Sequence, residues 1–333
     1  MKKLIAITVA AALLLAMVVA APVAAQTEWH VYPGPGTPIQ AAVDAAAPGD
    51  TIIVHAGTYN ETVTIRSDDY DLTLEGKGAV IEDTDGSLLY GIDLKGGAHH
   101  ISISGFEIMD FYQKDDAGIA GWTNPWDADF QAMHHITIHH NYIHNNYDGI
   151  NIGAFDWSAG SPPSWRHNNI TIQHNLIEDN HYRGIDFWSV SDSTVAWNEI
   201  LNNGGDWNGN GVFNEPADDM NANGVTDGDG MTWVYVSDST ATHNTINGSS
   251  EVGLSMNQST GNVVIHNDVT NNPNLGIALF GWGAPTTANV FVHNDARGNT
   301  SWDILCYLKW GSQVFGNKWV KNKYDEASPD PPV

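Results

Sequence analysis

A short pattern centred on asparagine recurs along much of this 333-residue chain. An aromatic, His or Gly residue precedes each asparagine, and a variable and usually an aliphatic residue follow. The seven asparagines are Asn141, Asn175, Asn198, Asn244, Asn267, Asn294 and Asn317. Their spacings of 34, 23, 46, 23, 27 and 23 residues reduce to a basic period of 23 with extra residues in three places. A period in this range is typical of stacked-repeat architectures.

The segments between these asparagines predict β-structure. Runs such as 136–138 and 276–279 carry β-type residues between turn residues and show no helical periodicity. Twenty-three residues accommodate three short parallel strands and three turns, and such units stack at a spacing of roughly 4.8 Å. We therefore predict an all-β solenoid of parallel strands.

We interpret the repeated asparagine as a structural ladder that sets the register, not as a set of site residues. Asn tolerates the left-handed backbone of a tight corner, and stacked amides can hydrogen-bond to each other. Histidines precede five of these asparagines, and a metal site is the alternative interpretation. A line of equivalent positions lacks the converging geometry of a ligand site, so stacking in the turns is favoured. These histidines are His140, His174, His243, His266 and His293.

The repeats resemble those of right-handed parallel β-helix proteins of the pectate-lyase-like superfamily. Their sequence pattern is closest to the NosD-type repeat. That repeat shows N-x-I-x-x-N followed by G-I-x-L. Residues 37–65 also resemble the first segment of this superfamily, in which a short helix covers the open end of the coil. The resemblance spans about residues 37–320 and implies a single-stranded right-handed parallel β-helix. It says little about function, because one fold hosts many activities.

Residues 37–48 predict the capping helix without reference to any family. Thr37 and Gln40 form a capping box with Pro38 at the first helical position. A Pro-Gly-Asp sequence at 48–50 ends the helix. One apolar stripe, which should face the first coil, contains Ile39, Ala42, Val43 and Ala46.

The N-terminal residues 1–25 have the pattern of a signal peptide, with two lysines, an apolar run and a small-residue cleavage site before Gln26. The alternative is an uncleaved anchor, because the apolar run nearly reaches membrane-spanning length. We expect residues 26–324 to form the β-helix, followed by a polar, proline-rich tail over 325–333. The expected protein is secreted, extracellular or at the cell surface, with no membrane span after cleavage.

The net charge of −26, with only 13 Lys and Arg, argues against a nucleic acid partner. It also bears on a glycan partner. An acidic polyuronate would require bound calcium to bridge like charges, whereas a neutral glycan would not.

Insertions into the 23-residue period indicate where a groove could lie. Residues 122–133 and 155–168 follow the G-I-x-L strand in two successive repeats, and 204–229 precede it two repeats later. In repeat proteins, insertions tend to map to one face, often the binding face. Strand alternation should turn four polar residues outward in one row on this face, namely Asn151, Asp186, Thr232 and Ser255.

Within this row, Asp186 is the candidate acid, base or nucleophile, because Asn151 and Arg183 should adjust its protonation. Glycoside hydrolysis needs a second carboxylate. The sequence leaves three possibilities open, which are Asp148, Asp156 and Asp229. Polysaccharide elimination would instead use Arg183 as the base. The alternative is a surface ion ladder of Arg183 with the aspartates in adjacent repeats, which would contribute little.

Tryptophans in the insertions suggest a sugar ligand, since large amphipathic rings stack on the apolar faces of sugars. Packing of these loops onto the coil is the alternative interpretation. The candidate substrate-binding residues, which include one strand tryptophan and the strand asparagine, are Asn151, Trp122, Trp126, Trp157, Trp165 and Trp188.

The insertion at 204–230 contains a tandem calcium-like motif. Oxygen ligands at positions one, three, five and nine, with glycine at six, match the front of an EF-hand loop. Position twelve departs from the EF-hand pattern, because it is Ala217 in one copy and Gly230 in the other. The tandem arrangement resembles the calcium repeats of thrombospondin type 3 more closely. We expect Ca²⁺ binding by Asp206, Asn208, Asn210, Asn214, Asp219, Asn221, Asn223 and Asp227.

Two functions of different class remain from the sequence. The first is a secreted carbohydrate-active enzyme, a glycoside hydrolase or polysaccharide lyase, acting in a groove on the first parallel sheet. The second is a non-catalytic, calcium-stabilised surface or matrix protein that binds glycans or neighbouring subunits. Copper delivery, which the NosD-type resemblance suggests, is less consistent because methionines and cysteines are not clustered. The oligomeric state stays open.

Overall fold

The computed structural model describes residues 26–124, 126–127, 130–212, 214, 216–219, 226–281, 283–307 and 314–327. The predicted signal peptide, two predicted calcium ligands (Asn221 and Asn223) and the tail beyond residue 327 lie outside this range. None of the described helices combines the length and the apolar character needed to cross a membrane.

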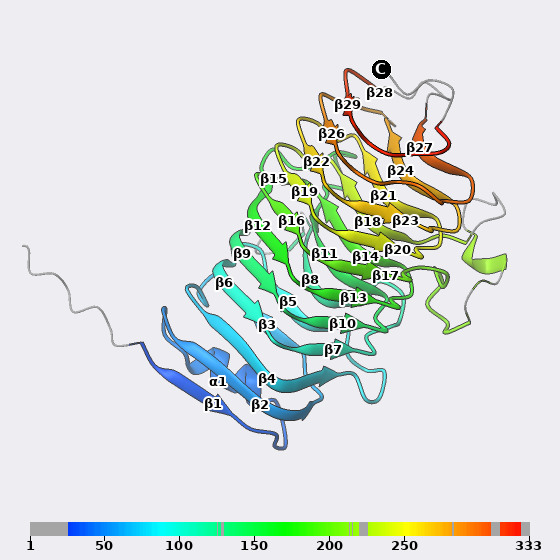
Figure 1. Cartoon of the computed structure of the whole chain (residues 1–333). Helices are drawn as coiled ribbons and strands as arrows, with labels where there is room; N and C mark the ends of the chain where they lie inside the picture. The colour runs from blue at the N-terminus through cyan, green and yellow to red at the C-terminus, as the bar shows by residue number, and fades with distance from the viewer. Residues whose placement is uncertain are drawn as a thin grey trace, which may run out of the picture.

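The chain winds into a right-handed coil of parallel strands stacked in three columns (Figure 1). The first column is a nine-stranded sheet of β3 (Val63–Ile65), β5 (Tyr90–Leu94), β8 (Ala117–Thr123), β11 (Asp148–Ala154), β14 (Arg183–Trp188), β18 (Asp229–Val234), β21 (Val252–Asn257), β24 (Leu275–Phe280) and β27 (Trp302–Cys306). The predicted all-β parallel β-helix is therefore confirmed.

The other two columns run along the remaining sides of the coil. The second column contains β1 (Glu28–Val31), β2 (Thr51–Tyr59), β4 (Thr73–Glu82), β6 (His99–Ser104), β9 (His134–His139), β12 (His167–Gln173), β16 (Thr194–Ala196), β19 (Thr240–Thr242), β22 (Val263–Ile265), β26 (Val290–Val292) and β29 (Lys318–Val320). The third contains β7 (Glu107–Met109), β10 (Tyr142–His144), β13 (Leu176–Glu178), β17 (Glu199–Leu201), β20 (Thr245–Asn247) and β23 (Asp268–Thr270). Short elements complete the described set: β15 (Val190–Ser191), β25 (Thr286–Thr287), β28 (Val314–Phe315) and the 3₁₀ turn η1 (Pro216–Asp218).

The core fills the inside of the coil. Strand alternation turns Ile150 and Ile152 of β11, and Ile185 and Phe187 of β14, into this core with no exposed surface. Their register partners lie one coil above and below, so each inward residue stacks on another. Burial of these columns drives folding, since there is no disulfide among the described residues.

A capping helix, α1 (Pro38–Ala45), covers the first coil and buries Ile39, Ala42 and Val43 as predicted. The predicted capping box does not form, because the Thr37 side chain makes no capping hydrogen bond. The backbone N–H groups of Ile39 and Gln40 instead donate to the carboxylate of Glu61 at 3.0 and 2.9 Å. A residue distant in sequence thus replaces the local cap.

Buried asparagine amides form the predicted ladder. The side-chain nitrogen of each asparagine donates to the side-chain oxygen of the next one, at 2.9–3.1 Å. The ladder runs through Asn141, Asn175, Asn198, Asn244, Asn267 and Asn294. The prediction was wrong for Asn317. Asn294 donates to Asn322, whereas Asn317 accepts from Asn289 in a separate ladder.

The left-handed residue of each corner is also not the asparagine but the residue before it. His140, His174 and His243 have φ of +54°, and Trp197 has +58°. Their rings stack from coil to coil, with centroids 5.1 Å apart for the first pair. This stacking agrees with the turn-stacking interpretation of the repeated histidines.

Candidate functional site

The outward row on the nine-stranded sheet has the predicted register. Asn151 lies opposite Asp186, Asp186 opposite Thr232, and Thr232 opposite Ser255. The same register sets Asp148 opposite Arg183 in the neighbouring coil.

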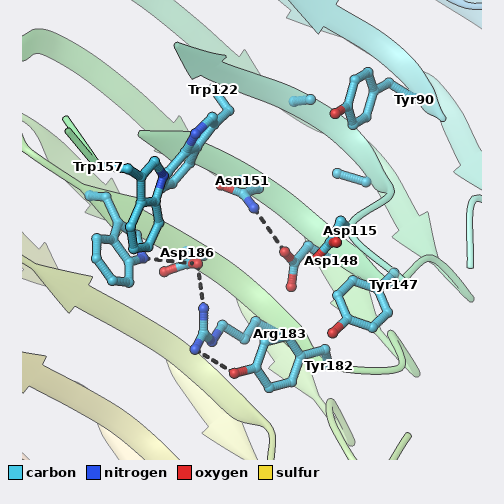
Figure 2. Close-up of a pocket in the computed structure, with 13 residues that line it drawn as sticks. Tyr90, Asp115, Trp122, Tyr147, Asp148, Asn151, Trp157, Tyr182, Arg183 and Asp186 are labelled. Atoms are coloured by element: carbon cyan, nitrogen blue, oxygen red, sulfur yellow. Dashed lines mark hydrogen bonds and ion pairs between the residues drawn. The ribbon is translucent and has the colours of Figure 1, made fainter. Parts of the chain in front are cut away.

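A pocket of about 400 Å³ opens over Asn151 and Asp186, at one end of this row (Figure 2). Its polar wall contains Asp115, Asp148, Asn151, Arg183 and Asp186. Its aromatic wall contains Tyr90, Trp122, Tyr147, Trp157, Tyr182 and Trp188. Three catalytic candidates and four of the six predicted substrate-binding residues therefore lie at one site.

Asp186 is buried, with 2% of its surface exposed, and is held by two donors. Its Oδ2 accepts from Arg183 Nη1 at 2.5 Å and from Trp188 Nε1 at 3.1 Å. Arg183 in turn donates to the Tyr182 hydroxyl at 2.6 Å and lies over the Tyr182 ring. Among the described residues, the ion pair of Arg183 is with Asp186, so the predicted ladder of Arg183 with Asp148 and Asp229 does not form.

Asp148 is the other buried carboxylate of the pocket, with 3% of its surface exposed. Its Oδ2 accepts from Asn151 Nδ2 at 2.8 Å. The other two candidate partners of Asp186 lie elsewhere. Asp156 accepts from Ser158 within its own loop, and Asp229 accepts from the Thr232 hydroxyl, and neither lines the pocket. Of the three alternatives, Asp148 is thus the one that lines the pocket together with Asp186.

Four buried polar atoms at this site have no hydrogen-bond partner among the residues that the structure describes. They are Asp148 Oδ1, Asn151 Oδ1, Arg183 Nε and Asp186 Oδ1. Most buried polar atoms in proteins are hydrogen-bonded, and exceptions require an explanation. A cluster of unsatisfied oxygens beside aromatic rings is suited to a ligand rich in hydroxyl groups.

Burial raises the pKa of both carboxyls, but their neighbours differ. Loss of solvation, reinforced by the nearby Asp186 carboxylate, raises the pKa of Asp148 to about 8. Burial also raises the pKa of Asp186, but the Arg183 guanidinium and its hydrogen bond oppose this. Burial alone would lower the pKa of Arg183, yet the surrounding acidic groups, Asp186 first, raise it well above its ordinary value. The neutral form of Asp148 is therefore favoured at neutral pH, whereas the pKa of Asp186 is raised overall by burial while its donors, Arg183 first, favour its ionised form.

Gly153 allows two tryptophans to meet across the pocket wall. It lies between Trp122 and Trp188 in register, and their rings make an edge contact with centroids 5.9 Å apart. A Cβ atom on Gly153 would lie 2.5 Å from the Trp122 ring. The absence of a side chain at this position therefore shapes the aromatic wall.

The other two predicted substrate-binding tryptophans lie outside this pocket. Trp126 is 67% exposed and lines an adjacent cavity with Trp122. Trp165 packs on Phe130 and His167, which matches the loop-packing alternative.

Sequence reasoning missed the three tyrosines of the pocket. Tyr147 and Tyr182 occupy the same position before the G-I strand in successive coils, and their rings lie 5.3 Å apart. Recurrence of an aromatic residue at one repeat position was the signal that could have found these two, whereas Tyr90 lies in the column of Asp148.

The calcium-like insertion reaches the pocket wall. The Tyr147 hydroxyl donates to the backbone carbonyl of Trp207 at 2.7 Å. One residue earlier, the buried Asp206 carboxylate accepts from the backbone of Asn210 and Gly211, and from His181 Nδ1 at 2.7 Å.

The other described residues of the motif lie around this turn. Asn208 donates to Asp218 at 2.9 Å, and Asn214 accepts from Thr226 at 2.9 Å. Asp227 is buried and Asp219 is half-buried. The chain therefore folds around the first half of the motif, while calcium binding itself stays a prediction.

Comparison with known proteins identifies the family. The family model for the right handed beta helix region matches residues 91–301. Similar solved structures include the A-module of mannuronan C-5 epimerase AlgE4 from Azotobacter vinelandii (TM-score 0.62, 17% identity, 85% of this chain and 71% of that chain). They also include XylC in complex with xylose (TM-score 0.59, 14% identity, 89% and 70%) and pectate lyase Pel9A (TM-score 0.56, 12% identity, 92% and 79%). At these identities the likeness concerns the fold alone.

A search of curated protein sequences finds no match. The family model covers well over half of the chain and agrees with the observed coil of parallel strands. The chain therefore belongs to the right-handed β-helix family.

Proposed function

We propose that this protein is a secreted carbohydrate-active enzyme that hydrolyses a neutral polysaccharide in the pocket of the nine-stranded sheet. The observation that carries the proposal is that Asp148, Asn151 and Asp186, each with a buried oxygen that lacks a hydrogen-bond partner among the described residues, line one pocket together with tryptophans. Sugar hydroxyls supply the missing hydrogen bonds, and sugar rings stack on the indoles.

The two carboxyls have environments that fit the two roles in glycoside hydrolysis. Asp148 stays protonated at neutral pH and serves as the general acid that donates to the leaving oxygen. Arg183 and Trp188 donate to Asp186 and favour its ionised form, in which it serves as the base or nucleophile. Divergent environments for a pair of carboxyls are the usual way in which one site provides an acid and a base.

The charge of the pocket favours a neutral substrate. Arg183 is the single cation among the lining residues, and Asp186 already neutralises it. A uronate carboxylate would find no free cation there and would meet Asp115 and Asp148. The xylose complex, the epimerase and the lyase all share only the fold with this chain, so the preference for a neutral sugar rests on the charge of the pocket.

Elimination with Arg183 as the base is disfavoured. The guanidinium donates to Asp186 and Tyr182, and its raised pKa keeps it protonated. A base must release its proton before it can accept one.

A glycan-binding protein without catalysis is the second candidate. The pairing of Asp186 with Arg183 favours it, since a carboxylate fixed in an ion pair is less available for chemistry. Calcium would then stabilise the coil through the insertion at 204–230.

The test is incubation with neutral and acidic polysaccharides, with and without Ca²⁺, followed by measurement of reducing ends. We expect a neutral glycan to be cut, and Asp148→Asn to lower kcat by about 10²–10⁴-fold while glycan binding persists. Asp229→Asn is the matched control, because Asp229 is also buried beside Arg183 but does not line the pocket. Binding without cleavage by the wild type would support the second candidate. Equal activity of Asp148→Asn and wild type would refute the assigned roles.

A further inference from the structure

Two His-His pairs lie side by side on the second column, away from the pocket. His99 and His100 begin β6, and His134 and His135 begin β9, with His99 opposite His134 in register (Figure 1). The two pairs belong to coils separated by 35 residues of sequence, including the 122–133 insertion. The 23-residue period does not reveal their contact.

The backbone explains why all four rings gather on the outer surface. His100 and His135 adopt the left-handed conformation, with φ of +57° and +56°. This interrupts the alternation of the strand, so both members of each pair avoid the core. Within each pair the Nδ1 atoms approach to 2.9 Å.

Between the coils the rings stack. The centroids of His100 and His135 are 4.6 Å apart, and those of His99 and His134 are 5.0 Å apart. One ligand nitrogen from each of His100, His134 and His135 lies within 4.8 Å of the other two. Among the described residues, these are the His, Cys and acidic side chains that converge in this way.

We propose that His100, His134 and His135 form a binding site for a late first-row divalent cation such as Zn²⁺, Ni²⁺ or Cu²⁺. Neutral imidazoles are preferred ligands for these ions, whereas Ca²⁺ and Mg²⁺ prefer oxygen. Three nitrogens bound at about 2.1 Å in tetrahedral geometry would be about 3.4 Å apart, so small ring rotations of the exposed His100 and His135 around the half-buried His134 suffice. The fourth position is left to solvent, and His99 acts as a positioning residue through its contact with His100.

The repeated histidines of the corners provide a contrast within the same molecule. His140 and His174 also have left-handed backbones and stacked rings, 5.1 Å apart. Within the described part of the chain, neither belongs to a group of three converging ligands. Ring stacking therefore occurs both at the corner histidines and at the proposed site. Only the proposed site, among the described residues, adds a third converging imidazole.

The experiment is calorimetric titration of the full mature chain, carrying no polyhistidine tag, with ZnCl₂ in excess Ca²⁺. The calcium occupies oxygen-ligand sites such as the one predicted at 204–230. The variant is His100→Asn with His135→Asn, since Asn tolerates the left-handed backbone. The matched control is His140→Asn with His174→Asn, which removes one stacked pair of the same geometry.

We expect saturable one-to-one binding to the wild type and to the control. The site variant should bind at least about tenfold more weakly, because loss of a mere second-shell partner already costs about 10–100-fold. His134→Gln, which leaves both left-handed positions intact, should show the same loss if the double variant fails to fold. The proposal is overturned if the wild type shows no saturable binding, if the site variants bind as tightly as the wild type, or if the control loses as much affinity.

Discussion

The buried, protonated Asp148 should make the stability of the protein depend on pH. A carboxyl with a raised pKa in the folded state keeps its proton while the unfolded chain releases its own. Its favourable contribution is complete below the unfolded pKa of about 4, and it is lost as pH rises toward the folded pKa of about 8. Asp148→Asn removes this dependence, because an amide stays neutral and can still accept the hydrogen bond from Asn151.

The magnitude follows from the two pKa values. A folded pKa of about 8 against an ordinary 3.8 corresponds to roughly 6 kcal/mol between low pH and pH above the folded value. This is an upper limit, because Asp148 and Asp186 titrate as a pair. We expect the asparagine variant to gain stability relative to wild type progressively from about pH 4 to about pH 8, and then to hold a constant advantage.

The assay is urea denaturation of both proteins across this pH range, with unfolding followed by tryptophan fluorescence. Asp229→Asn is the control. Burial raises the pKa of Asp229 only to about 6, so the advantage of that variant should stop growing near pH 6. Parallel curves of stability against pH for wild type and Asp148→Asn would refute the claim that Asp148 is buried in its neutral form.

Three further predictions follow from other parts of the fold. Asn244→Ala should destabilise by about 3 kcal/mol in urea denaturation, since it leaves buried donors of the ladder unpaired, whereas Asn247→Ala, at a half-buried position, should cost under about 1 kcal/mol. Gly153→Ala should weaken glycan binding by at least about tenfold in calorimetry with little loss of fold, because its Cβ would displace Trp122; unchanged affinity would exclude these rings from the binding surface. Removal of Ca²⁺ with a chelator should expose residues 204–230 to proteases, and an identical cleavage pattern with and without Ca²⁺ would contradict calcium binding there.

The glycan pocket shows which features of the site could be predicted from the sequence repeat. Register along the coil was predictable, because a fixed period and strand alternation decide which residues share a column. This placed Asn151, Asp186, Thr232 and Ser255 in one row across insertions of different length. The partner of Arg183 was not predictable from the same pattern. Asp148, Asp186 and Asp229 all act on the charge of Arg183, but its hydrogen bonds go to Asp186 and Tyr182, a choice that depends on side-chain packing.

The sequence by itself determined the period, the inward columns and the capping helix, because these depend on local chain geometry and on burial of every second residue. Only the tertiary structure decided which distant groups meet. It replaced the local cap with Glu61, moved the last step of the ladder from Asn317 to Asn322, and brought His100 beside His134 and His135. Such contacts depend on the path of insertions and on side-chain packing between coils, and neither has a signature in the spacing of residues along one chain.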